Sequence, residues 1–241
     1  MAQRRLTSVP RVLLVLVPLA LAAQITFAVL QPRPQARAEE LTSPPSSGML
    51  RALSLGDPVA LAQMLTLWLQ AFDNQPGISI PFLELDYGKV EAWLQRILDL
   101  DPHGQYPLLM ASQLYAEVPD EKKQRLMLDF VYREFLNDPN RRWPWLAHAA
   151  IMAKHRVKDL PLALRYAEAL AKHATGPDVP HWATQMRIFI YEDMGEYETA
   201  RVLLGGLLDS GVVRDEHELH LLIERLNHLK DAEKSSEPSE N

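Results

Sequence analysis

The chain lacks cysteine and any cluster of positive charge, and each absence excludes classes of protein. Without cysteine among its 241 residues, it has no disulfide, no cysteine nucleophile, no thiolate metal site and no lipoprotein lipid anchor. The formal net charge is −6, and no run of basic residues is present to displace counterions from phosphates. The sequence therefore predicts no binding to nucleic acid.

Motifs of the common enzyme classes are also missing. The chain contains no GxxxxGK[ST] phosphate loop, no GxSxG or SxxK nucleophile motif, no GxGxxG and no HExxH. Acidic pairs such as Glu91 and Asp99 have no evident reason to converge in a cleft. We therefore expect a protein that is not an enzyme, that uses no cofactor and that has no small-molecule substrate.

An apolar run near the N-terminus is the first positive signal. In residues 12–30 only Gln24 and Thr26 are polar. A helix of this length measures about 28 Å at about 1.5 Å per residue, enough to cross a bilayer. Three arginines precede the run, so the positive-inside rule places the N-terminus in the cytoplasm and the body outside it. The prediction is a single-pass protein of the inner membrane with a periplasmic body.

A cleavable signal peptide is the alternative interpretation. Cleavage after "ALA" at 20–22 would leave the apolar "ITFAVL" at the mature end, and cleavage after "ARA" at 36–38 would need an unusually long apolar region. Both interpretations export the body. They differ in whether the protein stays anchored or is a soluble periplasmic binding module.

Composition divides the chain into segments. Residues 31–49 and the C-terminal end are rich in proline, serine and charge, a composition that buries too little apolar surface to order itself. We expect a short basic segment at 1–11, a membrane helix or uncleaved signal anchor at 12–30, a flexible linker at 31–49, a helical-repeat domain at 50–231 and a disordered tail at 232–241.

The body carries an internal repeat. Trp145 and Trp182 are 37 positions apart (182 − 145 = 37), and the same spacing recurs in other pairs. These pairs are Ile151 with Ile188, Ala163 with Ala200, and the Asp-Pro step at 101–102 with that at 138–139. A fixed period in this range indicates stacked supersecondary units.

Each unit is predicted to contain two helices, and no strand pattern is evident. The expected pairs are 57–72 with 86–102, 106–117 with 120–138, 143–156 with 159–173, and 181–194 with 196–211. A final amphipathic segment, 214–231, reads as a capping helix because its leucines and one isoleucine share a stripe. The fold class predicted is all-α.

The repeat resembles the tetratricopeptide repeat. Helix "WPWLAHAAIMAKHR" partly follows the family's opening pattern with Trp145, Ala149 and Met152, and Ala200 with Leu204 fits its second helix after "GEY" at 195–197. The period departs from the family's, which is about 34 residues. The resemblance covers residues 101–211. It implies an α-solenoid of about four antiparallel helix pairs plus a capping helix, which binds a protein or peptide partner on its concave face as a scaffold or assembly factor.

Candidate partner-binding residues follow from this resemblance. Trp145 and Trp182 are expected in the core, whereas Trp143 is open to packing or to partner contact. The two arginines before it are expected to be solvated or to meet a partner's carboxylate. The predicted groove is mostly apolar and would accept an apolar or amphipathic helix. The candidates are Tyr106, Gln113, Arg141, Arg142, Trp143 and Arg187.

Three further features have competing interpretations. His217 and His220 with Glu224 on one helical face allow a metal-dependent enzyme, although no fourth ligand is evident. Gly205 and Gly206 inside a predicted helix suggest either the close approach of a neighbouring backbone or a flexible point for a partner. Residues 74–86 either pack over the first helix pair or form an exposed binding loop.

Overall fold

The computed structural model describes residues 11–30, 38–211, 213 and 215–236. The chain forms two compact units, one of Met1–Ala38 with Pro76–Ile78 and the other of Glu39–Gln75 with Ser79–Asn241. We describe each by itself, and we call the second unit the helical body. Residues 1–10 of the predicted basic segment, residues 31–37 of the predicted linker, and residues 212, 214 and 237–241 lie outside the described residues.

The first unit contains one apolar helix, α1 (Arg11–Leu30). It coincides with the predicted apolar run and accommodates Pro18 in its interior. Thr26 satisfies its hydroxyl within the helix by donating to the carbonyl oxygen of Ala22 at 2.8 Å. Among the described residues, no single helix is both long and apolar enough to cross a membrane, and the apolar helix at Val15–Leu30 is shorter than such a span.

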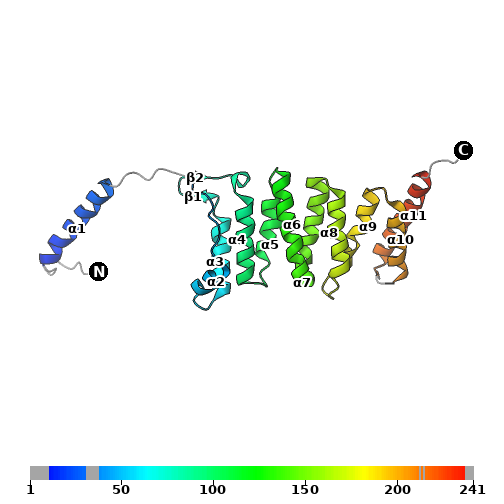
Figure 1. Ribbon diagram of the computed structural model, residues 1–241, viewed down its shortest axis with the longest axis horizontal. Coiled ribbons are helices and arrows are strands. Elements are labelled where there is room, and N and C mark those ends of the chain that lie inside the picture. The colour runs from blue at the N-terminus through cyan, green and yellow to red at the C-terminus, as the bar shows by residue number, and fades with distance from the viewer. Residues whose placement is uncertain (1–10, 31–37, 212, 214, 237–241) are drawn as a thin grey trace, which may run out of the picture. The chain divides into compact units, whose positions relative to one another are not determined.

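The helical body is all-α apart from one two-stranded sheet of minimal length (Figure 1). Its elements in chain order are α2 (Ser47–Leu53), α3 (Pro58–Gln70), β1 (Asn74–Gln75), β2 (Ile78–Ser79), the 3₁₀ turn η2 (Phe82–Glu84), α4 (Tyr87–Leu100), α5 (Tyr106–Leu109), the π-helix η3 (Met110–Leu114), the 3₁₀ turn η4 (Tyr115–Glu117), α6 (Glu121–Asn137), α7 (Pro139–Met152), the π-helix η5 (Ala153–Val157), α8 (Leu160–His173), α9 (His181–Asp193), α10 (Tyr197–Asp209) and α11 (Glu216–Ser236). The predicted helices are confirmed in position, with shifted ends.

Aspartates before the helices explain several starts. The carboxylates of Asp86, Asp120 and Asp159 accept backbone N–H groups in the first turns of α4, α6 and α8. Each side chain thereby satisfies donors that have no partner within the helix. Asp57 caps α3 in the same way. These caps are local, which is why the sequence alone locates them.

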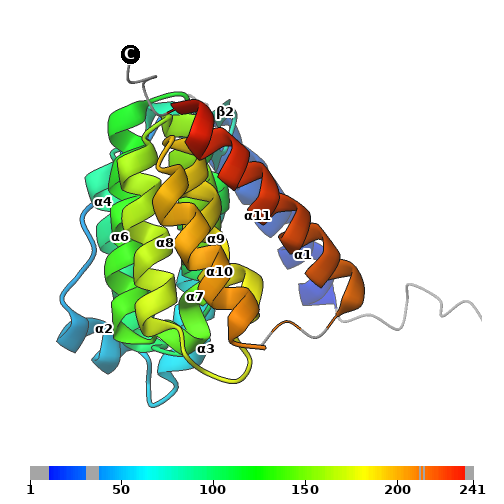
Figure 2. The same ribbon diagram turned by 90° about the vertical axis from the view of Figure 1, so that its right-hand side faces the viewer.

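Helices that are neighbours in the sequence pack side by side in the body. Contacts join α3 to α4, and each helix from α6 to α11 to the next one along the chain. Viewed from the end, α4, α6 and α8 form one layer and α3, α7 and α9 the other (Figure 2). We call the first layer B and the second, with α5, layer A. Contacts of α4 with α6 and of α7 with α9 connect helices within each layer.

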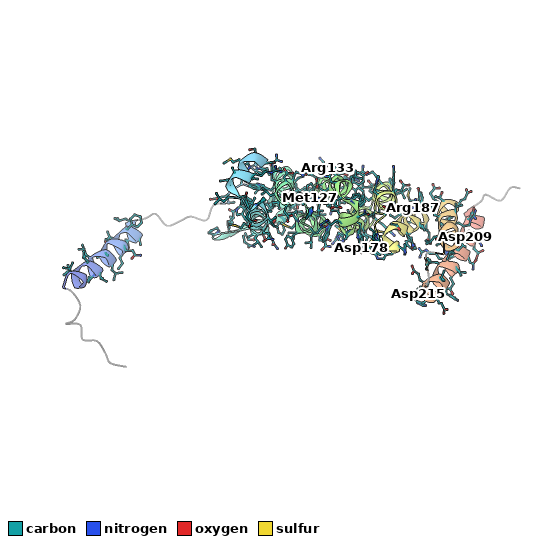
Figure 3. All side chains as sticks on the ribbon, turned by 90° about the horizontal axis from the view of Figure 1, so that it is seen from below. Met127, Arg133, Asp178, Arg187, Asp209 and Asp215 are labelled. Atoms are coloured by element: carbon teal, nitrogen blue, oxygen red, sulfur yellow. The ribbon has the colours of Figure 1, made fainter. Side chains whose placement is uncertain are left out.

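Two apolar clusters form the core. The larger runs from Leu41 to Ile190 and includes fully buried aromatic side chains such as Tyr115, Phe130 and Tyr166. Met127, near the middle of α6, is also fully buried there (Figure 3). The smaller cluster lies among α9, α10 and α11 and includes Ile188, Leu204 and Leu229. The core is thus much larger towards the N-terminal side of the body.

The predicted linker and tail are shorter than expected. Leu41 is buried, and the indole N–H of Trp93 donates to the carbonyl oxygen of Thr42 at 2.7 Å. The segment after residue 38 therefore packs on α4, because one leucine and one backbone acceptor hold it there. The predicted tail 232–241 is also corrected, since α11 continues to Ser236.

The start of α7 differs from the prediction of 143. The helix predicted at 120–138 does end close to Asp138, since α6 ends at Asn137, but Pro139 also opens α7. Proline fits the first turn because its missing N–H would have no partner there. Pro144 consequently lies inside the helix rather than in its first turn.

Part of the segment 74–86, from Ile80 to Leu85, packs on the body. Ile80 and Leu85 are buried, and the ring of Phe82 meets that of Tyr115 edge-on, with centroids 5.6 Å apart. This agrees with the packing interpretation. Leu83 remains exposed.

Candidate partner-binding face

Aromatic side chains gather near the N-terminal ends of the layer A helices. Tyr106 begins α5, Trp143 and Trp145 lie in the first two turns of α7, and Trp182 is the second residue of α9. We call these four residues the aromatic face. Because they occupy similar positions in successive helices of one layer, stacking the helices brings them into a row.

Specific contacts link members of the aromatic face. The indole N–H of Trp145 donates to Oε1 of Gln105 at 2.6 Å, which ties α7 to the start of α5. The rings of Trp143 and Trp182 meet edge-on with centroids 5.5 Å apart, which ties α7 to α9. The hydroxyl of Tyr106 donates to Oε1 of Gln70 at 3.2 Å. The two hydrogen bonds and the edge-on ring contact hold the rings in fixed orientations before any partner binds.

Part of the aromatic face remains open to solvent. Trp182 is 51% exposed and Tyr106 is 43% exposed, whereas Trp143 and Trp145 are half-buried. The prediction that Trp182 belongs to the core is therefore wrong, and Trp145 is only partly enclosed. Trp68 is also 41% exposed, whereas Trp93 is buried. Large exposed aromatic rings are typical of protein interfaces.

A cavity of about 530 Å³ opens beside Tyr106, between α3 and the start of α5. Its walls are mostly apolar, and Asp101 is the one charged residue that lines it. The other lining residues include Ala62, Thr66, Leu67, Ile97 and Gln105. A cavity of this size accepts a large apolar side chain or a short peptide segment.

A second cavity, of about 440 Å³, contains the predicted residue Arg142. Its side chain is 4% exposed, and its guanidinium donates to a carboxylate oxygen of Glu134 at 2.6 Å. It also donates to the backbone carbonyl oxygens of Glu134 at 2.7 Å and Pro102 at 3.0 Å. The expectation that Arg142 lies at the surface is wrong. The early start of α7 turns its side chain inward, where it joins α6 and α7 to the end of α4.

Asp99 lines the same cavity and remains ionised. Burial alone would raise the pKa of its carboxyl, but hydrogen bonds from Ser47, Gln95 and Arg96 outweigh burial and lower the pKa. Ser47 donates to Oδ2 of Asp99 at 2.8 Å. These hydrogen bonds hold the carboxylate of Asp99 in place, which indicates a structural role for this residue.

A third cavity, of about 450 Å³, lies among α8, α9 and α10 and contains the predicted residue Arg187 (Figure 3). Gly206 also lines it. A methyl group added at Gly205 or Gly206 would meet no atom within 4 Å. The predicted close approach of a neighbouring backbone is therefore wrong, and the glycines leave open space instead.

The predicted candidates do not form one site. Tyr106 and Trp143 lie on the aromatic face, and Arg142 and Arg187 line two other cavities. Arg141 is exposed and pairs with Asp138 at 3.0 Å, and Gln113 is exposed on η3. The sequence analysis did not identify Gln105, which accepts the hydrogen bond from Trp145. Its position directly before Tyr106-Pro107 was the one feature of the sequence that could have pointed to it.

The proposed metal site finds no support in the geometry. Nδ1 of His220 lies 3.4 Å from a carboxylate oxygen of Glu224, and both side chains are exposed. Among the residues that the structure describes, no group of three or more histidines and acidic residues could hold a metal ion.

The described body is thus an all-helical assembly of sequential helices with an exposed aromatic face beside an apolar cavity. No protein-family profile matches the chain, and neither a curated protein nor a solved structure matches it.

Proposed function

We propose that this chain is a membrane-anchored α-solenoid of helix pairs that binds a protein partner and acts as a scaffold or assembly factor for an envelope complex. Helix α1 would anchor it, and the body would lie on the extracytoplasmic side. The tetratricopeptide-like period and the contacts between successive helices support the solenoid part of the proposal.

The aromatic face beside the apolar cavity is the observation that carries the binding proposal. Trp182 and Tyr106 combine large exposed rings with fixed orientations, so little conformational entropy is lost on binding. The cavity next to Tyr106 would receive an apolar anchor side chain from the partner. The occupant that fits best is therefore an apolar or amphipathic segment.

Photo-crosslinking in native membranes tests the binding proposal. A photoreactive phenylalanine analogue replaces Tyr106 or Trp182 in the full chain, and the control position is Leu136, which is exposed on α6 in layer B. The expected result is one defined protein adduct from the aromatic face and none from Leu136. Equal, diffuse labelling from all three positions would contradict the proposal.

Alanine substitution measures how much each ring contributes to partner binding. Trp182→Ala and Tyr106→Ala should each weaken partner recovery, by about 30-fold if the ring is a binding hot spot worth about 2 kcal/mol. Leu136→Ala should leave recovery unchanged. Circular dichroism of each variant checks that the helices are retained.

The anchor is tested separately. Extraction of membranes with alkaline carbonate should leave the full chain in the pellet, and N-terminal sequencing should find a start at Met1 or Ala2. A mature end near Ala23 or Glu39 with release into the soluble fraction would replace the anchored protein by a soluble periplasmic module.

A further inference from the structure

Helix α3 carries no charged side chain on any side, which is unusual for a helix at the end of a folded body. From Pro58 to Phe72 the chain contains no charged residue. Ala62, Thr66 and Leu69 form the buried side of α3, which packs on α4. Its exposed polar residues, Gln63 and Gln70, lie on one flank, and a helix that is apolar over most of its surface is ordinarily covered by protein or by lipid.

The side of α3 that faces away from the core is exposed and apolar. It carries Ala60, Met64, Leu67, Trp68 and Ala71, which recur at spacings of three and four residues. Met64 is 67% exposed, Leu67 64% and Trp68 41%. We call these five residues the α3 stripe. These positions lie opposite the buried side because successive helical residues are about 100° apart. The ring of Trp68 also reaches back to that of Trp93 in α4, with centroids 4.8 Å apart, and Leu67 also lines the cavity beside Tyr106.

The chain leading from α1 enters the body next to this helix. The backbone N–H of Glu39 donates to Oε1 of Gln75 at 2.7 Å, and Nε2 of Gln75 donates to the carbonyl oxygen of Glu39 at 2.9 Å. Gln75 follows the last residue of α3 by only one short turn. The eight residues 31–38 separate α1 from Glu39, and eight residues span at most about 28 Å.

We propose that the α3 stripe lies in the headgroup region of the membrane, as a second membrane contact beside α1. This inference rests on the proposed anchor, since an α1 in the bilayer holds the C-terminal end of α3 close to the membrane surface. An interfacial helix buries an apolar side of this kind by about 5–10 Å, with tryptophan at the headgroup level.

The lack of charge favours lipid over a protein partner as the occupant. A protein interface uses charged groups around its rim to fix register and partner, and the α3 stripe offers none. Lipid chains are fluid and can cover an apolar surface without being fixed in one position along it. Because the stripe has no lysine or arginine, its attachment should depend little on anionic lipid or on salt.

The absence of native cysteine allows a direct test in the full chain. Met64→Cys is labelled with an environment-sensitive fluorophore, and the protein is reconstituted into phosphatidylcholine vesicles with or without spin-labelled lipid. The matched control is Val202→Cys, because Val202 is an exposed apolar residue of α10. Val17→Cys in α1 reports the anchor.

The expected result is about a twofold loss of emission at Met64 with spin-labelled lipid, since an interfacial helix lies within quenching range of the chains. Val202 should be quenched by aqueous iodide instead. A Met64 label quenched by iodide as strongly as Val202 overturns the inference. A Met64 label shielded from both iodide and lipid also overturns it, because protein, such as a second copy, would then cover the stripe.

The Val17 label separates this inference from the proposed anchor. Lipid quenching at Val17 without quenching at Met64 keeps the anchor and rejects the second contact. Quenching at Met64 alone keeps the contact and rejects the anchor. Quenching at neither position rejects both.

Discussion

The two ends of the helical body differ in both surface and core. At the N-terminal end, α3 presents an uncharged outer side and packs on the larger apolar cluster. At the C-terminal end, α11 carries acidic and basic residues throughout its length and packs on the smaller cluster. The terminal helix of a helical-repeat protein normally needs a polar outer side to remain soluble. α11 has such a polar outer side, and α3 does not.

Ion pairs show the same difference. In the larger core, Arg142 and Glu134 are almost fully buried and closely paired. At the C-terminal end, Arg201 pairs with Glu233 and Arg225 with Glu192, each at 2.7 Å, and these side chains are partly exposed. The guanidinium of Arg225 also lies 4.4 Å from the centroid of the Phe189 ring. Polar contacts at the edge of α11 therefore supplement the apolar contacts of the smaller core.

The largest effect is expected at the buried pair. Arg142→Leu leaves the carboxylate of Glu134 buried without its partner, which should cost about 3–5 kcal/mol of unfolding free energy. Arg201→Leu at the C-terminal end should cost only about 0–1 kcal/mol, because its pair is partly solvated. Denaturant unfolding of the full chain in mild detergent, followed by circular dichroism, measures both.

Neighbouring residues provide the controls for the buried pair. Arg141→Leu should change stability little, since Arg141 is exposed although adjacent in sequence. The double variant Glu134→Leu with Arg142→Leu should recover most of the loss, because no unpaired charge remains. Equal losses for Arg142→Leu and Arg201→Leu would remove the distinction between the two ends.

These arginines also show what sequence alone can predict. The helices could be placed from Asp caps, prolines in first turns and apolar periodicity, all of which act within a few residues. The burial of Arg142 could not, because it depends on Glu134 and Pro102 from other helices. The 37-residue period predicted the same environment for Trp145 and Trp182. Equivalence in sequence does not ensure equal burial, since Trp145 is held against α5 and Trp182 is left half-open.

A smaller effect, of opposite sign, is expected in α10. Gly205→Ala and Gly206→Ala should each stabilise the protein by about 0.5–1 kcal/mol, because alanine restricts the unfolded chain and no neighbouring atom opposes the methyl group. Slower hydrogen exchange of the α10 amides would measure the gain where it arises. The substitution would stabilise α10, which packs in the smaller core. The C-terminal end of the body would then differ less in stability from the N-terminal end.

Gly195 is the control for these glycines. Its φ of +78° lies in the left-handed region, so Gly195→Ala should destabilise the turn before α10 rather than stabilise it. Loss of stability in Gly205→Ala as well would show that the space beside α10 is occupied in solution.

The smallest effect is expected from histidines, whose burial differs between the two cores. His148 of α7 is half-buried in the larger core, and its Nε2 has no hydrogen-bond partner in the described structure. Burial lowers the pKa of its imidazole, despite opposing contributions from the Glu117 carboxylate and the backbone of Ser112. His228 of α11, by contrast, is exposed.

A lowered pKa in the folded state means that the unfolded state binds the proton more tightly. The contribution of His148 is therefore fully present above its unfolded pKa, about 6.5, and is lost as the pH falls through the folded value. Denaturant midpoints measured from pH 7.5 to pH 5 should fall for the unmodified chain and fall less for His148→Phe. His228→Gln, which removes one exposed histidine, is the matched control. A slope unchanged by His148→Phe would show that the larger core does not penalise a charge at this position.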